Sequence, residues 1–489
     1  MEYLVVIEVS QKQSYIFKTN RLKENVGASI IIRRITEELP KKFTDKAHFV
    51  FAGGGKSVYA FESEDRAKTF IAQMSEYVLI NEPGVELFMT YYGYDQDNES
   101  VIDAIHELYN KLDMKKSMRK SSFQIQGLGI TESCFDTQLP AVGKDSKTKR
   151  FYSQDVKVKI EEADRYEKEE YEQLIPGQYL DYRFASEFEE LGGTKGTKDY
   201  IGVVVIDGNK MGVKIKAFRE NFIKQHGQKA SFNYNQQYKA DLKKISKDID
   251  DSFKTSIRNM VGAVIEHLEE LKDQGITIKD GVLPLRPFIM AGDDICFACD
   301  ARISLKLAEI ALREIEKRDP IEGMKLHGCA GVAMVKSHYP FFRAHELAEA
   351  LCVEAKSILP TDYKEDESAI DFHIVQGELE DSLSVIRDQK YNHGKLTNKP
   401  YFLDGKGRKN SMDTFKERMA IFKDSEIGRG FVKGYRNALR EGETRSQEYV
   451  NNHNVPKRIK EAINGSYYDG HCIDFDVIEM LDLFKGWED

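Results

Sequence analysis

The amino-acid sequence predicts an α+β protein with two ferredoxin-like βαββαβ units, a mostly helical linker between them and a helical C-terminal region. The order strand, helix, hairpin, helix, strand occurs twice along the chain. A long segment with helical periodicity separates the first strand of the second copy from its hairpin. A chain of 489 residues is also too long for one compact core. We therefore expect four domains: residues 1–115, 116–197, 198–378 and 379–489.

The first copy begins with a strand predicted at Tyr3–Val9 and a helix at Arg21–Leu39. A hairpin pattern follows at Phe49–Phe61, where two β-type runs flank a Gly-Gly-Gly-Lys tip. The helix Glu64–Leu79 and the strand Val85–Tyr92 complete this copy.

The second copy begins with the apolar run Ile201–Asp207. Its long helix is predicted from apolar residues at spacings of three and four: Leu242, Ile245, Ile249, Phe253, Ile257, Val261, Val264, Leu268 and Leu271. A hairpin pattern at Arg286–Cys299 has the tip Ala-Gly-Asp-Asp at 291–294. The helix Ala301–Arg318 and the strand Gly328–Val335 follow.

The linker and the C-terminal region are charged and mostly helical in pattern. Helices are predicted at Val156–Leu174, Asp413–Phe422 and Gly430–Arg440. Clusters of basic residues could contact a nucleic-acid backbone, although such runs are more often solvated surface; they lie at Lys115–Lys120, Lys144–Arg150 and Lys406–Lys409.

The overall charge and the apolar pattern exclude two classes of protein. The formal net charge of −9 does not suit a generally basic nucleic-acid coat. The chain lacks a signal-peptide pattern at its start and an apolar run long enough to cross a bilayer. We expect a soluble, cytoplasmic protein without membrane contact.

Two of the six cysteines, Cys296 and Cys299, form a C-x-x-C pattern that invites a zinc or redox interpretation. They fall within a predicted strand, where residues three apart face opposite sides. A second C-x-x-C that would complete four ligands does not occur. We therefore expect buried free thiols.

Three carboxylates are the strongest candidates for chemistry. Asp207 ends the first strand of the second copy, and Asp293 and Asp294 lie at the tip of the neighbouring hairpin. An isolated Gly-Asp-Asp is most often an exposed turn, but the matched strand end favours a metal site. Carboxylates in this arrangement suit two Mg²⁺ or Mn²⁺ ions that bind substrate phosphates.

Further candidates lie around these acids. The turn Gly208-Asn209-Lys210-Met211-Gly212 could present backbone N–H groups to a triphosphate. Gly292 keeps the hairpin tip small enough for a nucleotide to approach the backbone. Lys356 lies late on a predicted helix, and its sequence position alone favours a solvated lysine at a helix end.

The first copy lacks an equivalent set of acids. Gly53-Gly54-Gly55-Lys56 occupies the hairpin tip, which leaves Glu8 as the acid on the first strand. A single glutamate beside a lysine is a poor site for two metal ions. We expect this copy to be non-catalytic, although its glycine-rich tip could hold a phosphate.

With these residues in hand, the chain resembles the large palm-domain subunit of type III CRISPR effector complexes, which makes cyclic oligoadenylates from ATP. The likeness spans most of the chain, and the fold is also similar to that of diguanylate cyclases and class III nucleotide cyclases. Its motifs, besides the two acidic ones, are Gln13–Phe17, Leu22–Ser29, Gly53–Lys56 and Cys134–Ala141.

The resemblance implies roles for individual residues. Asp207, Asp293 and Asp294 match the metal-binding acids of the second palm, with the Ile206 carbonyl as a further ligand. Gly208–Gly212 match the turn that faces the phosphates. The likeness also favours an active-site role for Lys356 over a solvated position, because Lys356 matches a lysine expected near the triphosphate.

Three departures from the family pattern shape the expected function. Ala291 replaces the first glycine of the hairpin motif, and its small methyl group is compatible with activity. A histidine-aspartate nuclease domain does not precede the first palm. The cysteine-rich zinc insertion is missing, since Cys134 stands alone between the palms. The pattern favours a compact cyclase without DNA-cutting activity.

The leading hypothesis is a nucleotide cyclase that makes a cyclic nucleotide or cyclic oligoadenylate from ATP for antiviral defence. The alternative is a non-catalytic or RNA-activated subunit of a type III CRISPR-like complex, with RNA and protein partners. A template-dependent polymerase is a third hypothesis, against which the lack of a long basic channel weighs. Self-association of the chain is compatible with each hypothesis.

Overall fold

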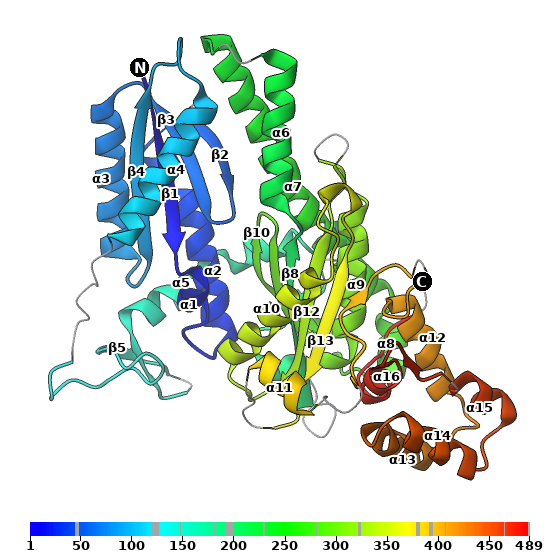
Figure 1. Ribbon diagram of the computed structural model, residues 1–489. Helices are drawn as coiled ribbons and strands as arrows, with labels where there is room; N and C mark the ends of the chain where they lie inside the picture. Colours follow the sequence, from blue (N-terminus) through cyan, green and yellow to red (C-terminus); the bar gives the residue numbers. More distant parts are fainter. Residues whose placement is uncertain are drawn as a thin grey trace.

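A computed structural model gives the arrangement of the chain (Figure 1). It describes residues 1–489 except 45–47, 119–126, 147, 180, 192–198, 228–229, 280, 321–323, 378–381, 391–394, 406, 464 and 488–489. Parts of all three basic clusters therefore lie outside the described residues. The protein is a mixed α+β fold with several sheets, as predicted. Within the described part of the chain, no helix is long and apolar enough to span a bilayer.

The N-terminal unit is a four-stranded antiparallel sheet in the order β2-β3-β1-β4. Its helices α2 and α3 connect the strands in the sequence order strand, helix, hairpin, helix, strand. The elements are β1 (Glu2–Ser10), α1 (Lys12–Ile16), α2 (Leu22–Glu37), β2 (Phe49–Gly53), β3 (Lys56–Phe61), α3 (Glu64–Asn81) and β4 (Glu86–Tyr94), followed by α4 (Val101–Ser117).

The linker is anchored to both units. Its helix α5 (Gln154–Glu172) packs on α2, where Arg34 pairs with Glu162 and lies 4.0 Å from the Tyr166 ring centroid. The linker also contains strands that the sequence pattern does not predict. These are β5 (Ala141–Lys144), β6 (Phe151–Ser153) and β7 (Arg183–Phe184), the last of which pairs with β9 (Val282–Leu283).

The second unit contains a six-stranded sheet in the order β10-β11-β8-β12-β13-β14. The pair β12–β13 is parallel and the other pairs are antiparallel. Its elements are β8 (Tyr200–Gly208), α6 (Met211–His226), α7 (Phe232–Glu266), α8 (Leu268–Asp273), β10 (Leu285–Ala291), β11 (Asp294–Asp300), α9 (Ala301–Glu316), β12 (Gly328–Lys336), α10 (Phe341–Ser357), β13 (Ala369–Ile374) and β14 (Tyr401–Phe402).

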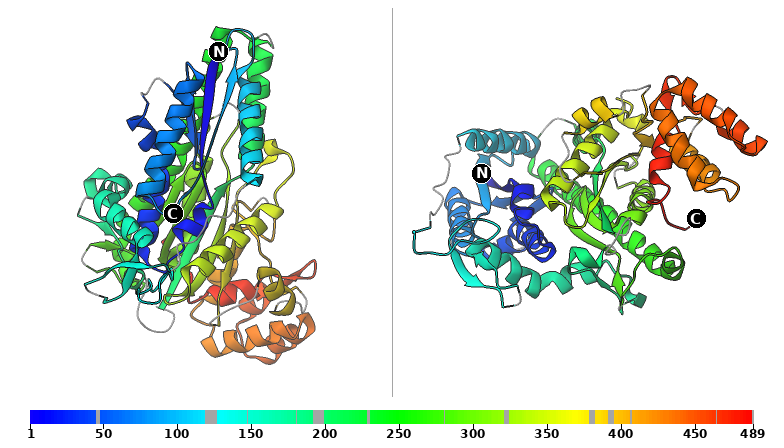
Figure 2. Two further views of the ribbon diagram at one scale, coloured as in Figure 1. Left: turned by 90° about the vertical axis from the view of Figure 1, so that its left-hand side faces the viewer. Right: turned by 90° about the horizontal axis from the view of Figure 1, so that it is seen from below.

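The sequence analysis places the end of the second domain at residue 378. The strand β14 lies beyond this residue but pairs with β13 of the second unit. The C-terminal region is mostly helical and lies at the far end of the second unit from the N-terminal unit (Figure 2). Its elements are α11 (Leu383–Lys390), α12 (Met412–Phe422), α13 (Arg429–Arg440), α14 (Glu443–Asn452), α15 (Lys457–Ile463), β15 (Tyr467–Tyr468), β16 (His471–Cys472) and α16 (Phe475–Met480).

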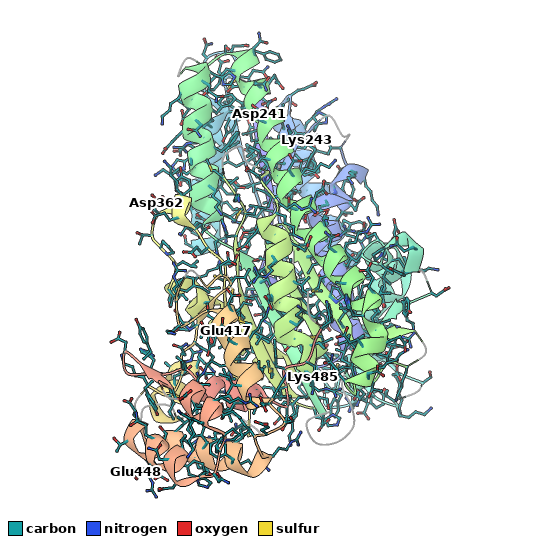
Figure 3. All side chains as sticks on the ribbon, turned by 90° about the vertical axis from the view of Figure 1, so that its right-hand side faces the viewer. Asp241, Lys243, Asp362, Glu417, Glu448 and Lys485 are labelled. Carbon is teal, nitrogen blue, oxygen red and sulfur yellow. The ribbon has the colours of Figure 1, made fainter. Side chains whose placement is uncertain are left out.

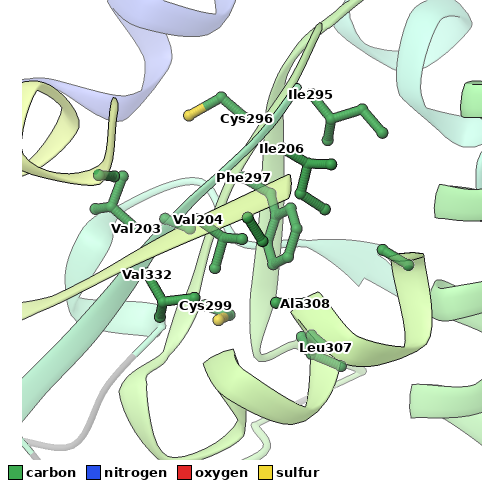
Figure 4. Close-up of a cluster of buried hydrophobic side chains, with 14 of the residues drawn as sticks. Val203, Val204, Ile206, Ile295, Cys296, Phe297, Cys299, Leu307, Ala308 and Val332 are labelled. Atoms are coloured by element: carbon green, nitrogen blue, oxygen red, sulfur yellow. The ribbon is translucent and has the colours of Figure 1, made fainter. Parts of the chain in front are cut away.

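The core of the second unit holds its central strands rigidly. Val204 and Ile206 of β8 and Phe297 of β11 are fully buried and pack toward Leu307 and Ala308 of α9, as Figure 4 shows. Burying a large apolar side chain stabilises a fold by roughly 1.5–3 kcal/mol. The strand ends that carry the acidic residues are therefore firmly positioned.

All six cysteines are buried and free of disulfide bonds. Cys296 and Cys299 lie on opposite faces of β11 (Figure 4), so the C-x-x-C pattern does not form a joint thiol site. The sequence prediction of buried free thiols is confirmed.

The long helix α7 joins the two units. In the view of Figure 3, Lys243 lies on the part of α7 beside the N-terminal unit, far from Lys485 and Glu448 of the C-terminal region. On this helix, the Ser246 hydroxyl donates to the carbonyl of Ala52 in β2. One turn later, Asp250 Oδ1 accepts a hydrogen bond of 3.3 Å from the Gly292 N–H. One helix thus holds the hairpins of both units.

The two hairpin tips touch each other. Gly292 has a φ angle of +66°, and a Cβ atom on it would lie 3.0 Å from the backbone nitrogen of Gly54. Gly54 has a similar φ angle of +59°, but a Cβ atom there would meet no other atom within 4 Å. Glycine at position 292 therefore allows both the left-handed backbone conformation and the close approach of the two hairpins.

We expect Gly292→Ala to lower the free energy of unfolding more than Gly54→Ala. Each alanine would take a left-handed conformation that costs about 1–2 kcal/mol, and the Cβ at 292 would also crowd the opposite hairpin. Urea unfolding of the two variants measures the difference. Equal losses would show that the hairpins do not press on each other.

Candidate active site

A cavity of about 570 Å³ lies between the two units. Its walls come from α1 and α2 and the glycine hairpin of the N-terminal unit, and from β8, β11 and α10 of the second unit. Part of α7 closes one side through Lys243, Lys247 and Asp250. The space is large enough for small-molecule ligands of nucleotide size.

Two of the predicted acids stand opposite each other at this cavity. Asp207 of β8 and Asp294 of β11 are partners in the antiparallel register, and both line the cavity. Asp293 lies in the turn before Asp294, and its carbonyl accepts a hydrogen bond of 3.2 Å from the Gly208 N–H. A Cβ atom on Gly208 would lie 2.9 Å from the Asp293 Cβ, so this close approach requires glycine.

Lys356 reaches the acids from α10. Its Nζ lies 2.6 Å from Asp207 Oδ2 and donates to the Gly208 carbonyl at 3.2 Å. The ammonium group therefore partly neutralises the acidic cluster. The structure thus brings together Asp207, Asp293, Asp294 and Lys356, whose catalytic roles stay predictions.

Burial and neighbouring carboxylates raise the pKa of two of these acids, Asp293 and Asp294. Burial, followed by the charges of Asp294 and Asp207, raises the pKa of Asp293 to about 6. Burial and the charge of Asp207 likewise raise the pKa of Asp294, against the opposing charges of Lys12 and Lys356. Carboxylates so placed gain from a further cation, because that cation would relieve their repulsion.

The donor set suits Mg²⁺ or Mn²⁺ bound together with a substrate. In the described part of the chain, no group of three or more His, Cys, Asp or Glu side chains is arranged to hold a metal ion. Mg²⁺ commonly takes one or two carboxylates and completes its shell with phosphate oxygens and water. Asp207 and Asp294, paired across β8 and β11, meet that requirement.

The turn after β8 is held mainly by contacts away from the acids. The Asn209 side chain is buried and donates to the Glu367 carbonyl at 2.8 Å. Lys210 Nζ donates to the carbonyls of Pro360 and Asp362 and lies 3.3 Å from Asp366 Oδ1. These contacts direct Lys210 toward the 360–366 loop instead of the acids. Gly208, Met211 and Gly212 form the remaining part of the turn and the start of α6.

The Ile206 side chain lies in the core between β11 and β12. The predicted role of its carbonyl as a metal ligand stays a prediction.

Sequence reasoning missed several polar residues that the fold brings to the cavity, among them Lys12, Gln13 and Glu349. Lys12 and Gln13 lie on α1 of the N-terminal unit, and Lys12 Nζ donates to the Gly54 carbonyl at 2.6 Å. Glu349 precedes Lys356 by two helical turns on α10, a spacing that puts both residues on one face of the helix. That spacing was the one signal in the sequence for Glu349.

The corresponding position in the N-terminal unit is neutralised by lysines. Glu8 is buried, with Lys116 Nζ at 2.7 Å and Lys56 Nζ at 3.2 Å from its carboxylate oxygens. Two ammonium groups occupy the surroundings that a metal ion would need. That this unit is non-catalytic stays a prediction.

No known family profile and no curated protein sequence matches the chain. Solved structures do. A Csm1-Csm4 cassette in complex with AMPPNP matches at a TM-score of 0.51 and 13% identity, over 99% of this chain and 70% of that chain. A cassette in complex with cA4 matches at a TM-score of 0.49 and 12% identity, over 98% of this chain and 70% of that chain. Csm1 in T.onnurineus matches at a TM-score of 0.47 and 13% identity, over 99% of this chain and 70% of that chain. The chain therefore shares the fold of Csm1, as the sequence resemblance implied.

We expect Asp293→Asn to raise the free energy of unfolding by about 1–2 kcal/mol at pH 8 without divalent cations. The folded state holds the Asp293 proton more tightly than the unfolded state, since its pKa rises from 3.8 to about 6. The stability that protonation provides is complete below pH 3.8 and is lost as the pH rises through 6. The gain from asparagine should therefore vanish toward pH 4.

Urea unfolding at pH 4 and pH 8 in the presence of a chelator measures this effect. Asp251→Asn, at an exposed position on α7, serves as the control and should change little at either pH. A gain for Asp293→Asn that is equal at both pH values would contradict the electrostatic explanation.

Proposed function

We propose that this chain is a nucleotide cyclase that uses ATP and two divalent cations. The observation that carries the proposal is the facing pair Asp207 and Asp294, joined by Asp293 and Lys356, at a cavity between two α+β units. The shared fold adds support, because the Csm1-Csm4 cassette of that fold was solved with the ATP analogue AMPPNP. We infer that both units are βαββαβ palms, with the second unit catalytic.

The proposed reaction joins a ribose 3′-oxygen to the α-phosphorus of a second nucleotide. The bond between the α-phosphorus and the bridging oxygen breaks, pyrophosphate leaves, and the hydroxyl proton passes to solvent. Asp207, Asp293 and Asp294, with the Ile206 carbonyl, would hold the cations. Bound there, Mg²⁺ or Mn²⁺ would activate the hydroxyl and neutralise charge on the leaving pyrophosphate.

The residues of the chain have distinct tasks in this scheme. Lys356 releases Asp207 and turns to the triphosphate, which carries more charge than one carboxylate. The N–H groups of Met211 and Gly212, in the first turn of α6, would face the phosphates, because the start of a helix favours anions. The Gly208 N–H already donates to the Asp293 carbonyl. Asn209 and Lys210 hold that turn through the 360–368 segment. The cavity between the units brings two nucleotides together.

The product that fits best is a cyclic oligoadenylate messenger in antiviral defence. The alternative is an RNA-activated or non-catalytic subunit of a type III complex. One observation favours it: the matched Csm1 was solved together with Csm4, so that fold offers a protein interface. In that case, purified protein would yield product from ATP only after RNA and a protein partner are added.

The Asp293→Ala/Asp294→Ala variant should lose product formation by roughly 10³-fold or more, because several kcal/mol of transition-state stabilisation depend on the cations. The measurement is mass spectrometry of products from the four nucleoside triphosphates with Mg²⁺ or Mn²⁺, together with pyrophosphate release.

The matched control is Glu441→Ala/Glu448→Ala, which removes two exposed carboxylates on the C-terminal helices. Circular dichroism should show that both double variants fold. Full activity in the Asp293→Ala/Asp294→Ala variant would refute the assignment of the site.

A further inference from the structure

Gln13 and Glu349 form a polar pair that bridges the two units at the cavity wall. The Gln13 side-chain nitrogen, on α1, donates a hydrogen bond to Glu349 Oε1, on α10. Both residues line the cavity that contains the acidic cluster. The pair therefore lies in the candidate active site, but neither residue takes part in the proposed contacts with metal ions and phosphates.

Within the described part of the chain, the charges that act most strongly on Glu349 are those of acids. The titratable and charged groups that face it are Asp294, Asp207, Glu346 and His345. His345 Nδ1 lies 3.6 Å from Glu349 Oε2, but burial lowers the pKa of His345 to about 3, so the ring is neutral. Burial and the three acids raise the pKa of Glu349 to about 7. A carboxylate in such surroundings lowers the stability of the folded protein unless a bound ligand supplies hydrogen-bond donors.

The position of the pair along α10 matches the length of a nucleotide. Glu349 and Lys356 are seven residues apart, which is two turns and roughly 10 Å along the helix axis. Cys352 and Val353 lie between them and also line the cavity. Ile16, Val205, Ile295 and Cys296 add apolar wall. A triphosphate held near Lys356 would thus extend its base over apolar side chains toward Glu349.

We propose that Gln13 and Glu349 recognise the edge of an adenine base, an inference that rests on the proposed function. Glu349 accepts a hydrogen bond from the exocyclic amine, and the second N–H of the Gln13 amide donates to the neighbouring ring nitrogen. Adenine presents this donor and acceptor side by side. Guanine and hypoxanthine present an oxygen in place of the amine, which would face the Glu349 carboxylate unfavourably.

The test is a comparison of binding between two unreactive nucleotides. In 3′-deoxyadenosine triphosphate and 3′-deoxyinosine triphosphate the attacking hydroxyl is absent, and the bases differ at the amine. Calorimetry at pH 8 with Mg²⁺ should show that the intact protein binds the adenosine form roughly 10-fold to 100-fold more tightly. Glu349→Ala and Gln13→Ala should each bring this ratio close to one.

Two variants separate recognition of the base from structural damage. Glu349→Gln should keep most of the preference, because its amide oxygen still accepts a hydrogen bond. Glu354→Ala, which removes an exposed carboxylate of α10 that pairs with Arg387, should keep the full ratio. A ratio near one in the unmodified protein, or an unchanged ratio in both Glu349→Ala and Gln13→Ala, would overturn the inference.

Failure of this inference can be distinguished from failure of the proposed function. A protein that forms no product but shows the adenosine preference, lost in Glu349→Ala, would refute the cyclase and support base recognition. An active cyclase whose preference ignores both residues would refute base recognition alone. Failure to bind either nucleotide would overturn both proposals.

Discussion

The pairing of β8 with β11 is the constraint on which the site depends. Antiparallel register sets Asp207 directly opposite Asp294, and the apolar core behind these strands holds them there. Burial, together with the charges of neighbouring carboxylates, raises the pKa of Asp293 and Asp294. Positive charge near these carboxylates would therefore stabilise the fold, and Lys356 supplies part of that charge.

The contact between the two hairpins turns two similar units into one site. The glycine tip of the N-terminal unit lies against Gly292, and α7 holds both hairpins through Ser246 and Asp250. This contact places α1 opposite α10, so that Gln13 reaches Glu349 across the cavity. A single unit of this kind would present the acids on an open surface without a facing wall.

The acid on the first strand has different charged neighbours in the two units. Glu8 is surrounded by Lys56 and Lys116, whereas Asp207 has one lysine and faces two further acids. The acid on the first strand is thus neutralised by lysines in one unit and belongs to an acidic cluster in the other. The N-terminal unit contributes walls and hydrogen-bonding groups to the cavity, and the second contributes the acids.

Local sequence patterns are enough to predict the class of the fold, most element positions and the acidic strand ends. Apolar periodicity identified the long helix and the strands, and small residues between β-type runs identified both hairpins. These signals are local, because helix and strand periods are set within a few residues. The acids were found because each directly adjoins such a run.

Contacts between side chains that are far apart in the sequence follow from the packing of the folded chain. The Gln13–Glu349 pair joins residues 336 positions apart, and Lys12 reaches the second unit's site through the hairpin contact. Lys210 turns to Asp366 instead of the acids, because the 360–366 loop packs against the turn after β8. The pairing of β13 and β14 likewise depends on distant packing. No local pattern encodes such contacts, since they follow from how whole units pack together.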